Sequence, residues 1–225
     1  MTEESHMGPE EATRQMPAFS PVLRAAAHFF TVVFHPVFMP LYGTLLIVWA
    51  YPYHFAAFTG FFRFRVLGAV ILNTILFPCI TALLLKALGF IQSVYMRTQR
   101  DRIIPYAATM IFYFWIFYVF RHQKDIPQEL TAFMLGNFIA IIIAFLCNIF
   151  MKISMHLLGA GGLLGMGFTL LSAPYFSAAP LLMALILLAG VLGTCRLLLG
   201  AHSPRELYWG LMAGIVAQLM AVWII

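Results

Sequence analysis

The C-terminal stretch AAPLLMALILLAGVLGTCRLLLGAHSPRELYWGLMAGIVAQLMAVWII, residues 178–225, contains two long apolar runs. Between them lies a short polar segment with Arg196, His202, Arg205 and Glu206. An apolar run of about 20 residues is long enough to cross the hydrocarbon core of a bilayer as a helix. The stretch therefore predicts two transmembrane helices joined by a polar turn at one membrane surface.

The whole chain has the composition of a membrane protein. Of its 225 residues, 63% are hydrophobic and only 9% are charged, whereas soluble domains contain about 25% charged residues. The net charge of +5 comes from basic residues near the predicted helix ends, where anionic lipid headgroups are the natural partners. The charge therefore requires no nucleic-acid partner.

Apolar runs separated by polar segments predict an all-α polytopic transmembrane bundle of about seven spans, with six as the alternative. The expected spans cover residues 27–51, 66–90, 103–120, 131–151, 156–172, 178–199 and 204–225. We expect residues 1–24 to form a flexible polar N-terminal tail and residues 25–225 to form a single transmembrane helical domain. Pro36 and Pro40 fall within the first span and should bend or break its helix.

The polar segment between the last two spans combines three side chains that suit a phosphate group. Arg196 offers a forked cation for phosphoryl oxygens, and His202 is able to act as a base or nucleophile near neutral pH. Glu206 lies one helical turn after His202, where its carboxylate is able to orient the imidazole. Residues 203–206 are also a helix start of the capping-box type. Two roles of Glu206 therefore stay open, as part of the helix cap and as the partner of His202.

Two other clusters of basic residues lie at expected helix ends. Arg97, Arg100 and Arg102 precede the third span, and Lys152 and His156 lie four residues apart between the fourth and fifth spans. Every second span brings the chain back to the side of the membrane on which it started. The two clusters follow the second and fourth spans, and the polar segment before the last span follows the sixth. All three clusters are therefore expected at one membrane face, either as a phosphate site or as ordinary interfacial cations.

Two further features have structural interpretations. His28 and His35 are seven residues apart in the first span with no carboxylate beside them, which favours interfacial or hydrogen-bonded histidines over a metal site. The glycines of the fifth span, and Gly210 and Gly214 of the last span, have the spacing that is typical of close helix packing.

The order and spacing of three motifs resemble the type 2 phosphatidic acid phosphatase superfamily. The segment CR-x5-H-x3-E at residues 195–206 keeps the spacing of that family's Ser-Arg-x5-His-x3-Asp motif, with Cys for Ser and Glu for Asp. The segment ISMH at residues 153–156 keeps the Ser and the His of its Pro-Ser-Gly-His motif. Its Lys-x6-Arg-Pro motif is matched less closely, by Arg102 three residues before Pro105. The resemblance extends from residue 95 to residue 210.

The resemblance implies a phosphohistidine mechanism with no metal and no cofactor. His202 would be the nucleophile, oriented by Glu206, and His156 would protonate the leaving oxygen. The phosphate ligands would come from Arg196, Arg97, Arg100, Arg102 and Lys152. The substrate would be a membrane lipid phosphate, with a phosphomonoester or pyrophosphate on a phosphatidate-like or polyprenyl chain. The location would be a bacterial inner (plasma) membrane.

Two other functions fit the same sequence. A catalytically degenerate protein of the same fold would bind phospholipid or serve as a scaffold without hydrolysing its ligand. A transporter would bind an anion at the arginine cluster, although transporters usually bind near the bilayer midplane and these cations lie at helix ends. The oligomeric state has no signature in the sequence.

Overall fold

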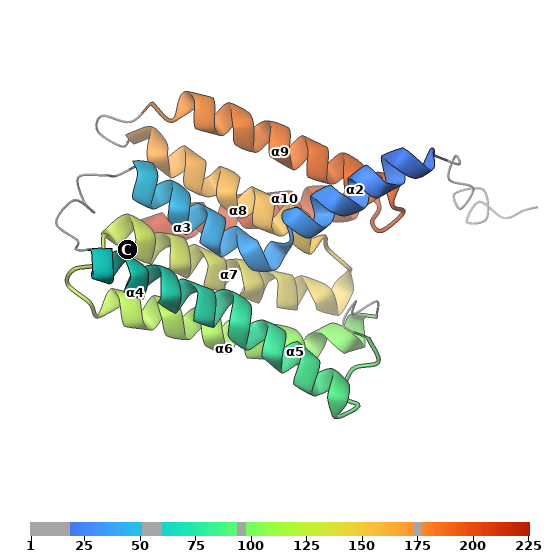
Figure 1. Ribbon diagram of the computed structural model, residues 1–225, viewed down its shortest axis with the longest axis horizontal. Helices are drawn as coiled ribbons and strands as arrows, with labels where there is room; N and C mark the ends of the chain where they lie inside the picture. Colours follow the sequence, from blue (N-terminus) through green and yellow to red (C-terminus); the bar gives the residue numbers. More distant parts are fainter. Residues whose placement is uncertain (1–18, 51–59, 94–97, 173–176) are drawn as a thin grey trace, which may run out of the picture.

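The computed structural model describes residues 19–50, 60–93, 98–172 and 177–225. Within these ranges the protein is an all-helical bundle without β-strands (Figure 1). The helices are α2 (Pro21–Val33), α3 (Met39–Ala50), α4 (Gly60–Ile71), α5 (Phe77–Ala87), α6 (Gln99–Arg121), α7 (Gln128–Phe150), α8 (Met155–Thr169), α9 (Ala179–Leu198) and α10 (Pro204–Ile224). Two 3-10 turns, η1 (Pro36–Phe38) and η3 (Leu170–Ser172), and a π-helical segment, η2 (Leu72–Leu76), complete the described elements.

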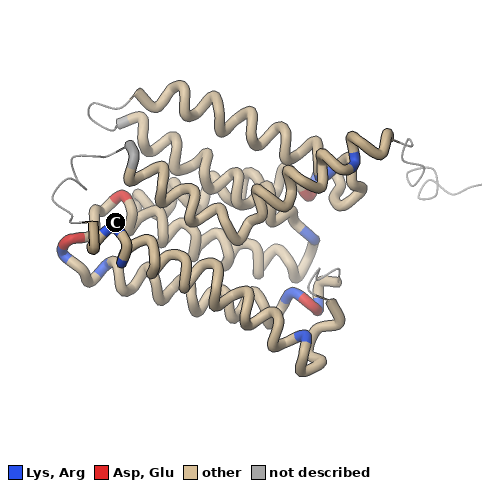
Figure 2. Tube along the Cα trace, viewed as in Figure 1, with Lys and Arg blue, Asp and Glu red and all other residues tan. Residues whose placement is uncertain are grey.

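Six helical segments in the described part of the chain are long and apolar enough to cross a membrane, which indicates an integral membrane protein. They are Pro21–Val48, Gly60–Ala87, Gln99–Arg121, Gln128–Phe150, Ala179–Leu198 and Pro204–Ile224. Among the described residues, Lys, Arg, Asp and Glu gather toward the two ends of the bundle and are absent from its middle (Figure 2). This distribution matches the two surfaces of a bilayer.

The helix expected at residues 156–172 is α8, and it is shorter than the other spans. It has 15 residues, or about 22 Å of length, which is too short for a membrane span. Eleven of these residues are buried, because α8 packs against α10, α9, α7 and α3. A helix that is surrounded by protein does not need to match the full thickness of the hydrocarbon core. In the described part of the chain six helical segments thus have the length of a membrane span, which is the alternative count. The helix α8 is shorter and enclosed by protein, and it still takes the chain from one end of the bundle to the other (Figure 1).

The first span is broken where the sequence predicts it. Helix α2 ends at Val33 and the turn η1 begins at Pro36, because proline lacks an N–H and disfavours helical geometry in the residue before it. Helix α2 itself begins at Pro21, behind Ser20, whose hydroxyl accepts the Leu23 N–H. Residues 21–24 of the expected tail thus belong to a helix, and residues 1–18 lie outside the described residues.

Helices α8 and α10 pack with their backbones in direct contact. A Cβ atom added at Gly161 would collide with the backbone of Leu211, and one added at Gly214 would collide with the carbonyl of Leu158. Only glycine lets two helices approach this closely. The close packing predicted for the glycines of these helices is confirmed.

Replacing Gly214 with alanine should lower the stability of the protein. The added methyl group overlaps the Leu158 carbonyl, and overpacking of this kind typically costs about 1–3 kcal/mol. Gly193→Ala in α9 is the matched control, because a Cβ at Gly193 meets no atom within 4 Å and alanine favours a helix. The melting temperature in detergent should fall for Gly214→Ala and stay constant or rise for Gly193→Ala. Equal melting temperatures would contradict the packing argument.

Candidate functional site

The three clusters singled out in the sequence meet at one end of the bundle. Two hydrogen bonds hold their segments together. Asn148 Nδ2, near the end of α7, donates to the Gln99 carbonyl oxygen at the start of α6 (2.9 Å). The Ser154 N–H, just before α8, donates to the Glu206 carbonyl oxygen in the first turn of α10 (3.1 Å). The described members of the clusters therefore lie at the same end, as the count of spans predicts.

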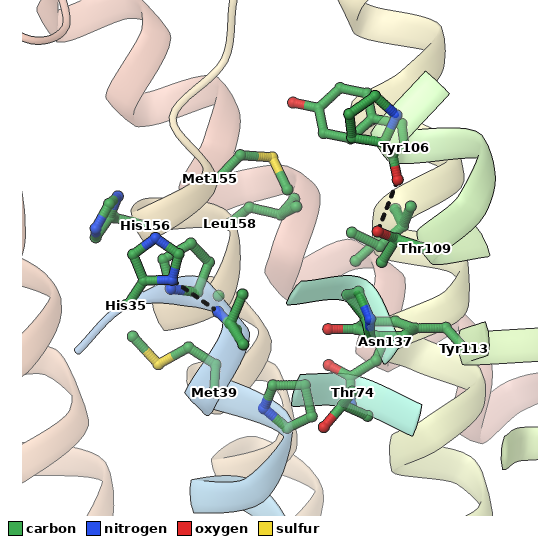
Figure 3. A pocket seen from close by; sticks show the side chains of 18 of the residues that line it. His35, Met39, Thr74, Tyr106, Thr109, Tyr113, Asn137, Met155, His156 and Leu158 are labelled. Carbon is green, nitrogen blue, oxygen red and sulfur yellow. Dashed lines mark hydrogen bonds between the residues drawn. The ribbon is translucent and has the colours of Figure 1, made fainter. Parts of the chain in front are cut away.

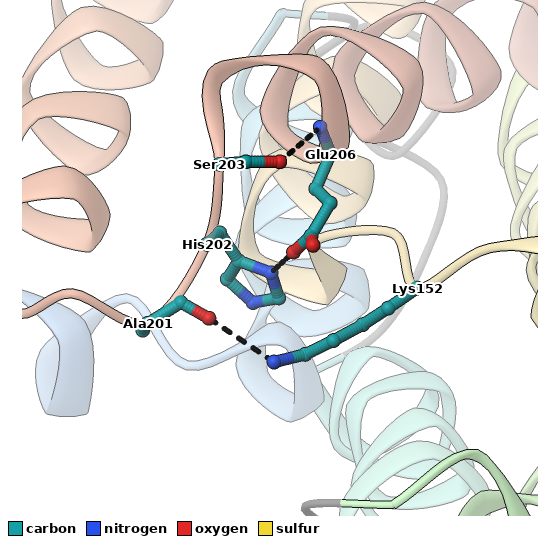
Figure 4. Close-up of polar contacts among 5 residues, drawn as sticks. All are labelled: Lys152, Ala201, His202, Ser203 and Glu206. Atoms are coloured by element: carbon teal, nitrogen blue, oxygen red, sulfur yellow. Dashed lines mark hydrogen bonds and ion pairs between the residues drawn. The ribbon is translucent and has the colours of Figure 1, made fainter. Parts of the chain in front are cut away.

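His202 lies in the turn before α10, where Glu206 holds its ring. The Nδ1 atom of His202 is 2.5 Å from Glu206 Oε2, and the Ser203 hydroxyl accepts the Glu206 N–H (Figure 4). Serine therefore caps α10, while the carboxylate of Glu206 contacts the imidazole. With Nδ1–H donated to the carboxylate, the neutral ring keeps its lone pair on Nε2. Lys152 Nζ donates to the Ala201 carbonyl oxygen (3.1 Å) and supports the same turn.

Positive charge outweighs negative charge around His202. The pKa of His202 is lowered to about 4, chiefly by burial and also by the charges of Lys152 and Arg196, while Glu206 acts in the opposite direction. Burial also lowers the pKa of Lys152, together with the charges of Arg102 and Arg196 and against that of Glu206. At neutral pH His202 is therefore an uncharged base among fixed cations, which is the protonation state that a nucleophile needs.

His156 lies in the first turn of α8 with its side chain buried. Its Nε2–H donates to the Thr31 carbonyl oxygen (3.1 Å), which leaves Nδ1 for another partner. The ring of His35 stands edge-on to the ring of His156, with centroids 5.4 Å apart. His35 Nδ1 accepts the Val37 N–H (3.4 Å), so the neutral His35 ring has its proton on Nε2.

Two arginines lie beside these histidines. Arg196, near the end of α9, is half-buried, and its Nε is buried with no hydrogen-bond partner among the described residues. Arg102, in the first turns of α6, is 8% exposed. Because a buried polar nitrogen without an acceptor is costly, Arg196 is suited to an anionic ligand. Arg100 is exposed and lies outside the cavity wall described next, and Arg97 lies outside the described residues.

The arginines and histidines line one end of a cavity of about 570 Å³, which is called its mouth because it lies toward a charged end of the bundle. Its polar mouth consists of His35, Arg102, His156, Arg196 and His202. From there the cavity extends between η1, α5, α6, α7 and α8, along a wall that is mostly apolar (Figure 3). Met39, Ile141, Ile153, Met155 and Leu158 are among the apolar residues of this wall. The cavity is therefore amphipathic, with cationic side chains at one end and mostly apolar side chains along the rest of its wall.

His35 is hydrogen-bonded, as the sequence interpretation expects, because its Nδ1 accepts the Val37 N–H. It also lines the cavity beside His156, which the sequence interpretation did not foresee, whereas His28 does not line the cavity. The signal that distinguishes the two histidines is Pro36. A proline break in a spanning helix takes the preceding residue out of the helix, and it places His35 at the bend between α2 and η1. Lys152 does not line the cavity and instead binds the turn that holds His202.

Comparisons of the chain with protein-family models, with curated proteins and with solved structures find no match. The chemistry available to the site therefore follows from its own residues. Two guanidinium groups suit the oxygens of a tetrahedral anion. A neutral imidazole oriented by a carboxylate supplies a nucleophile, and a second imidazole with an available nitrogen supplies an acid or a base.

Replacing Arg196 with lysine should weaken binding of a tetrahedral anion. A planar guanidinium binds two oxygens at once, whereas an ammonium is a point charge. The measurement is the rise in melting temperature that orthovanadate causes in the purified protein, which should be largely lost in Arg196→Lys. Arg205→Lys is the matched control, because Arg205 is exposed and lies outside the cavity. The same loss in both variants would make Arg196 an ordinary interfacial cation.

Proposed function

We propose that the chain is a membrane-embedded lipid phosphatase of the type 2 phosphatidic acid phosphatase superfamily. It hydrolyses a phosphomonoester or pyrophosphate on a phosphatidate-like or polyprenyl lipid, in the plasma membrane of a bacterium. One observation supports the proposal above all: Arg196, His156 and His202 share the polar mouth of a cavity whose interior is apolar. The mouth suits a phosphate headgroup, and the interior suits a hydrocarbon chain.

In the first chemical step, His202 Nε2 attacks phosphorus. The N–P bond forms while the bond from phosphorus to the leaving oxygen breaks. Burial, and next the charge of Arg196, lower the pKa of His156 to about 3, so His156 takes up its proton when the phosphate dianion binds beside it. It then gives its Nδ1 proton to the leaving oxygen, so that the lipid leaves as an alcohol, or as a phosphate when the substrate is a pyrophosphate. Glu206 stabilises the positive charge that develops on the His202 ring, because its carboxylate accepts the Nδ1–H.

In the second step, water hydrolyses the phosphohistidine. His156 is now neutral at Nδ1 and takes a proton from the attacking water molecule. The new O–P bond forms, the N–P bond breaks and its electron pair returns to His202 Nε2. Inorganic phosphate is released, and His156 is again protonated for the next turnover.

The cations of the mouth neutralise the phosphoryl oxygens during both steps. Arg196 contributes a guanidinium whose Nε has no hydrogen-bond partner among the described residues, and Arg102 lines the same mouth. His35 adds a third donor through Nε2–H. Preorganised donors of this kind often make the largest contribution to lowering the barrier. Lys152 acts indirectly, because it holds the Ala201 carbonyl in the turn before His202.

The second candidate function is binding of phospholipid without hydrolysis. It is favoured by two departures from the family motifs, namely Glu206 in place of an aspartate and the separation of Arg102 from Pro105. A protein of this kind would still hold a headgroup at the mouth of the cavity. It differs from the enzyme in one observable, the release of phosphate.

Purified protein in nanodiscs should release inorganic phosphate from phosphatidate or from a polyprenyl phosphate or diphosphate. His202→Asn should abolish release, because the nucleophilic nitrogen is lost, and it should leave lipid binding in place. Brief incubation of the wild type with a phosphorus-labelled substrate should leave an acid-labile, alkali-stable phosphoryl group on His202. Lipid binding without any release would instead support the second function.

Glu206→Gln should remove most of the phosphatase activity. Glutamine retains hydrogen-bonding ability but lacks the negative charge that stabilises the imidazolium, and the comparable Asp→Asn change in a serine-protease triad lowers turnover about 10⁴-fold. Glu206→Asp keeps the charge and should retain a substantial part of the activity.

Ser203→Ala is the control for the role of this segment as a helix cap. It removes the hydroxyl that accepts the Glu206 N–H and should cost about 1 kcal/mol of stability with little loss of turnover per folded molecule. Melting curves and activity are measured on the same preparations. Full activity in Glu206→Gln would show that the carboxylate does not support His202.

A further inference from the structure

The far end of the cavity contains a second polar group, away from the arginines. Thr74, Tyr113 and Asn137 line the cavity from three different segments, η2, α6 and α7, and they lie on the opposite side of the view from His35 and His156 (Figure 3). All three lie well inside membrane-spanning segments, where polar side chains are costly and mark function. The 11 positions from Arg102 to Tyr113 along α6 correspond to about 16 Å.

Asn137 provides the first piece of evidence. Its Nδ2 is buried with no hydrogen-bond partner among the described residues, although Asn137 lies in the middle of α7. An amide N–H in apolar surroundings is costly without an acceptor. Asn73, also deep in a span, differs in this respect, because its Nδ2 donates to the Ala69 carbonyl oxygen (2.9 Å) and its side chain does not line the cavity.

The π-helical segment η2 provides the second, independent piece of evidence. It interrupts the middle of the span Gly60–Ala87, and π-turns within helices are frequent at functional sites. Thr74 lies in this segment, is fully buried, and contributes to the wall of the cavity. Its hydroxyl donates to the Val70 carbonyl oxygen (2.8 Å), so its lone pairs are available as acceptors.

We propose that Thr74, Tyr113 and Asn137 form a hydrogen-bonding subsite for an oxygen on the lipid chain, about 16 Å from the phosphate. The proposal rests on the proposed function for the phosphate end, and it adds that the preferred substrate chain is oxygenated. Between the two ends the wall is mostly apolar, with Met39, Ile141 and Leu158. Tyr106 and Thr109 also line it, but the Thr109 hydroxyl already donates to the Pro105 carbonyl oxygen (2.7 Å). The intervening chain is therefore hydrocarbon.

A hydroxyl group fits the subsite better than a carbonyl. Asn137 offers a donor, Thr74 offers an acceptor, and the Tyr113 hydroxyl is able to act as either. A carbonyl oxygen pairs with donors alone and leaves the acceptor unused. A hydroxyl donates and accepts at once, so it is able to pair with the whole set. The ligand class is therefore a phosphorylated amphiphile with a hydroxyl on its hydrocarbon chain.

The test compares pairs of alkyl phosphates that differ only in a terminal hydroxyl. Octyl, dodecyl and hexadecyl phosphate and their terminally hydroxylated counterparts are presented to the purified protein in nanodiscs. Phosphate release gives kcat/KM, and the shift in melting temperature gives binding. At the chain length that joins the mouth to the subsite, the hydroxyl should raise kcat/KM about tenfold, which is the effect of one buried hydrogen bond. Shorter chains should show no gain.

Two variants locate the effect. Asn137→Leu and Tyr113→Phe should each bring the ratio of hydroxylated to plain substrate close to one. Tyr113→Phe removes a single oxygen atom, so it keeps the test valid if Asn137→Leu fails to fold. Asn73→Leu is the matched control, because it removes a buried amide of a spanning helix outside the cavity, and it should keep the wild-type ratio.

Binding and turnover separate this proposal from the proposed function. A stabilisation that depends on the hydroxyl and is lost in Asn137→Leu and Tyr113→Phe supports the subsite, even when no phosphate is released. Equal kcat/KM and equal binding for plain and hydroxylated chains at every length overturn the subsite and leave the phosphatase standing. A hydroxyl preference that survives both substitutions, or no binding and no release with any probe, also overturns it.

Discussion

The backbone contact between α8 and α10 is the constraint on which the rest of the site depends. A Cβ atom at Gly210 would lie 2.5 Å from the Ser154 carbonyl oxygen, and the N–H of the same serine donates to the Glu206 carbonyl oxygen. No side chain separates the two helices there, so rotamer changes have no effect on their spacing. His156 and the carboxylate that orients His202 are therefore placed by rigid elements, as precise chemistry requires.

The bilayer imposes a second constraint, through the cost of burying charge. Around His202 the cations Lys152 and Arg196 lie beside the carboxylate of Glu206, and the buried Nε of Arg196 has no hydrogen-bond partner among the described residues. Such an arrangement is expensive unless an anion joins it, because a buried cationic nitrogen without an acceptor is unfavourable. The excess of positive charge thus favours a phosphate over a neutral headgroup. The apolar wall behind it favours a ligand with a chain over a free anion.

The helical membrane class and the break at Pro36 were accessible from the sequence, because apolar run length and proline geometry are local properties. The shared location of Arg102, His156, Arg196 and His202 was also accessible, because it follows from counting spans. The length of α8 was not, since apolar composition does not distinguish a helix facing lipid from one enclosed by other helices. The place of His35 and the direction of the Glu206 carboxylate depend on tertiary packing. So does the cavity, whose far wall joins residues from three segments that no sequence pattern relates.

The enclosure of α8 affects how the molecule responds to its membrane. Helices in contact with lipid adapt to bilayer thickness by tilting, and α4 has such a surface, with Phe64 77% exposed. Eleven of the 15 residues of α8 are buried, so acyl chains exert little direct force on it. A thicker or thinner bilayer tilts the outer helices around an inner helix whose position is set by glycine contacts. The geometry at His156 is thereby insulated from changes in the thickness of the surrounding bilayer.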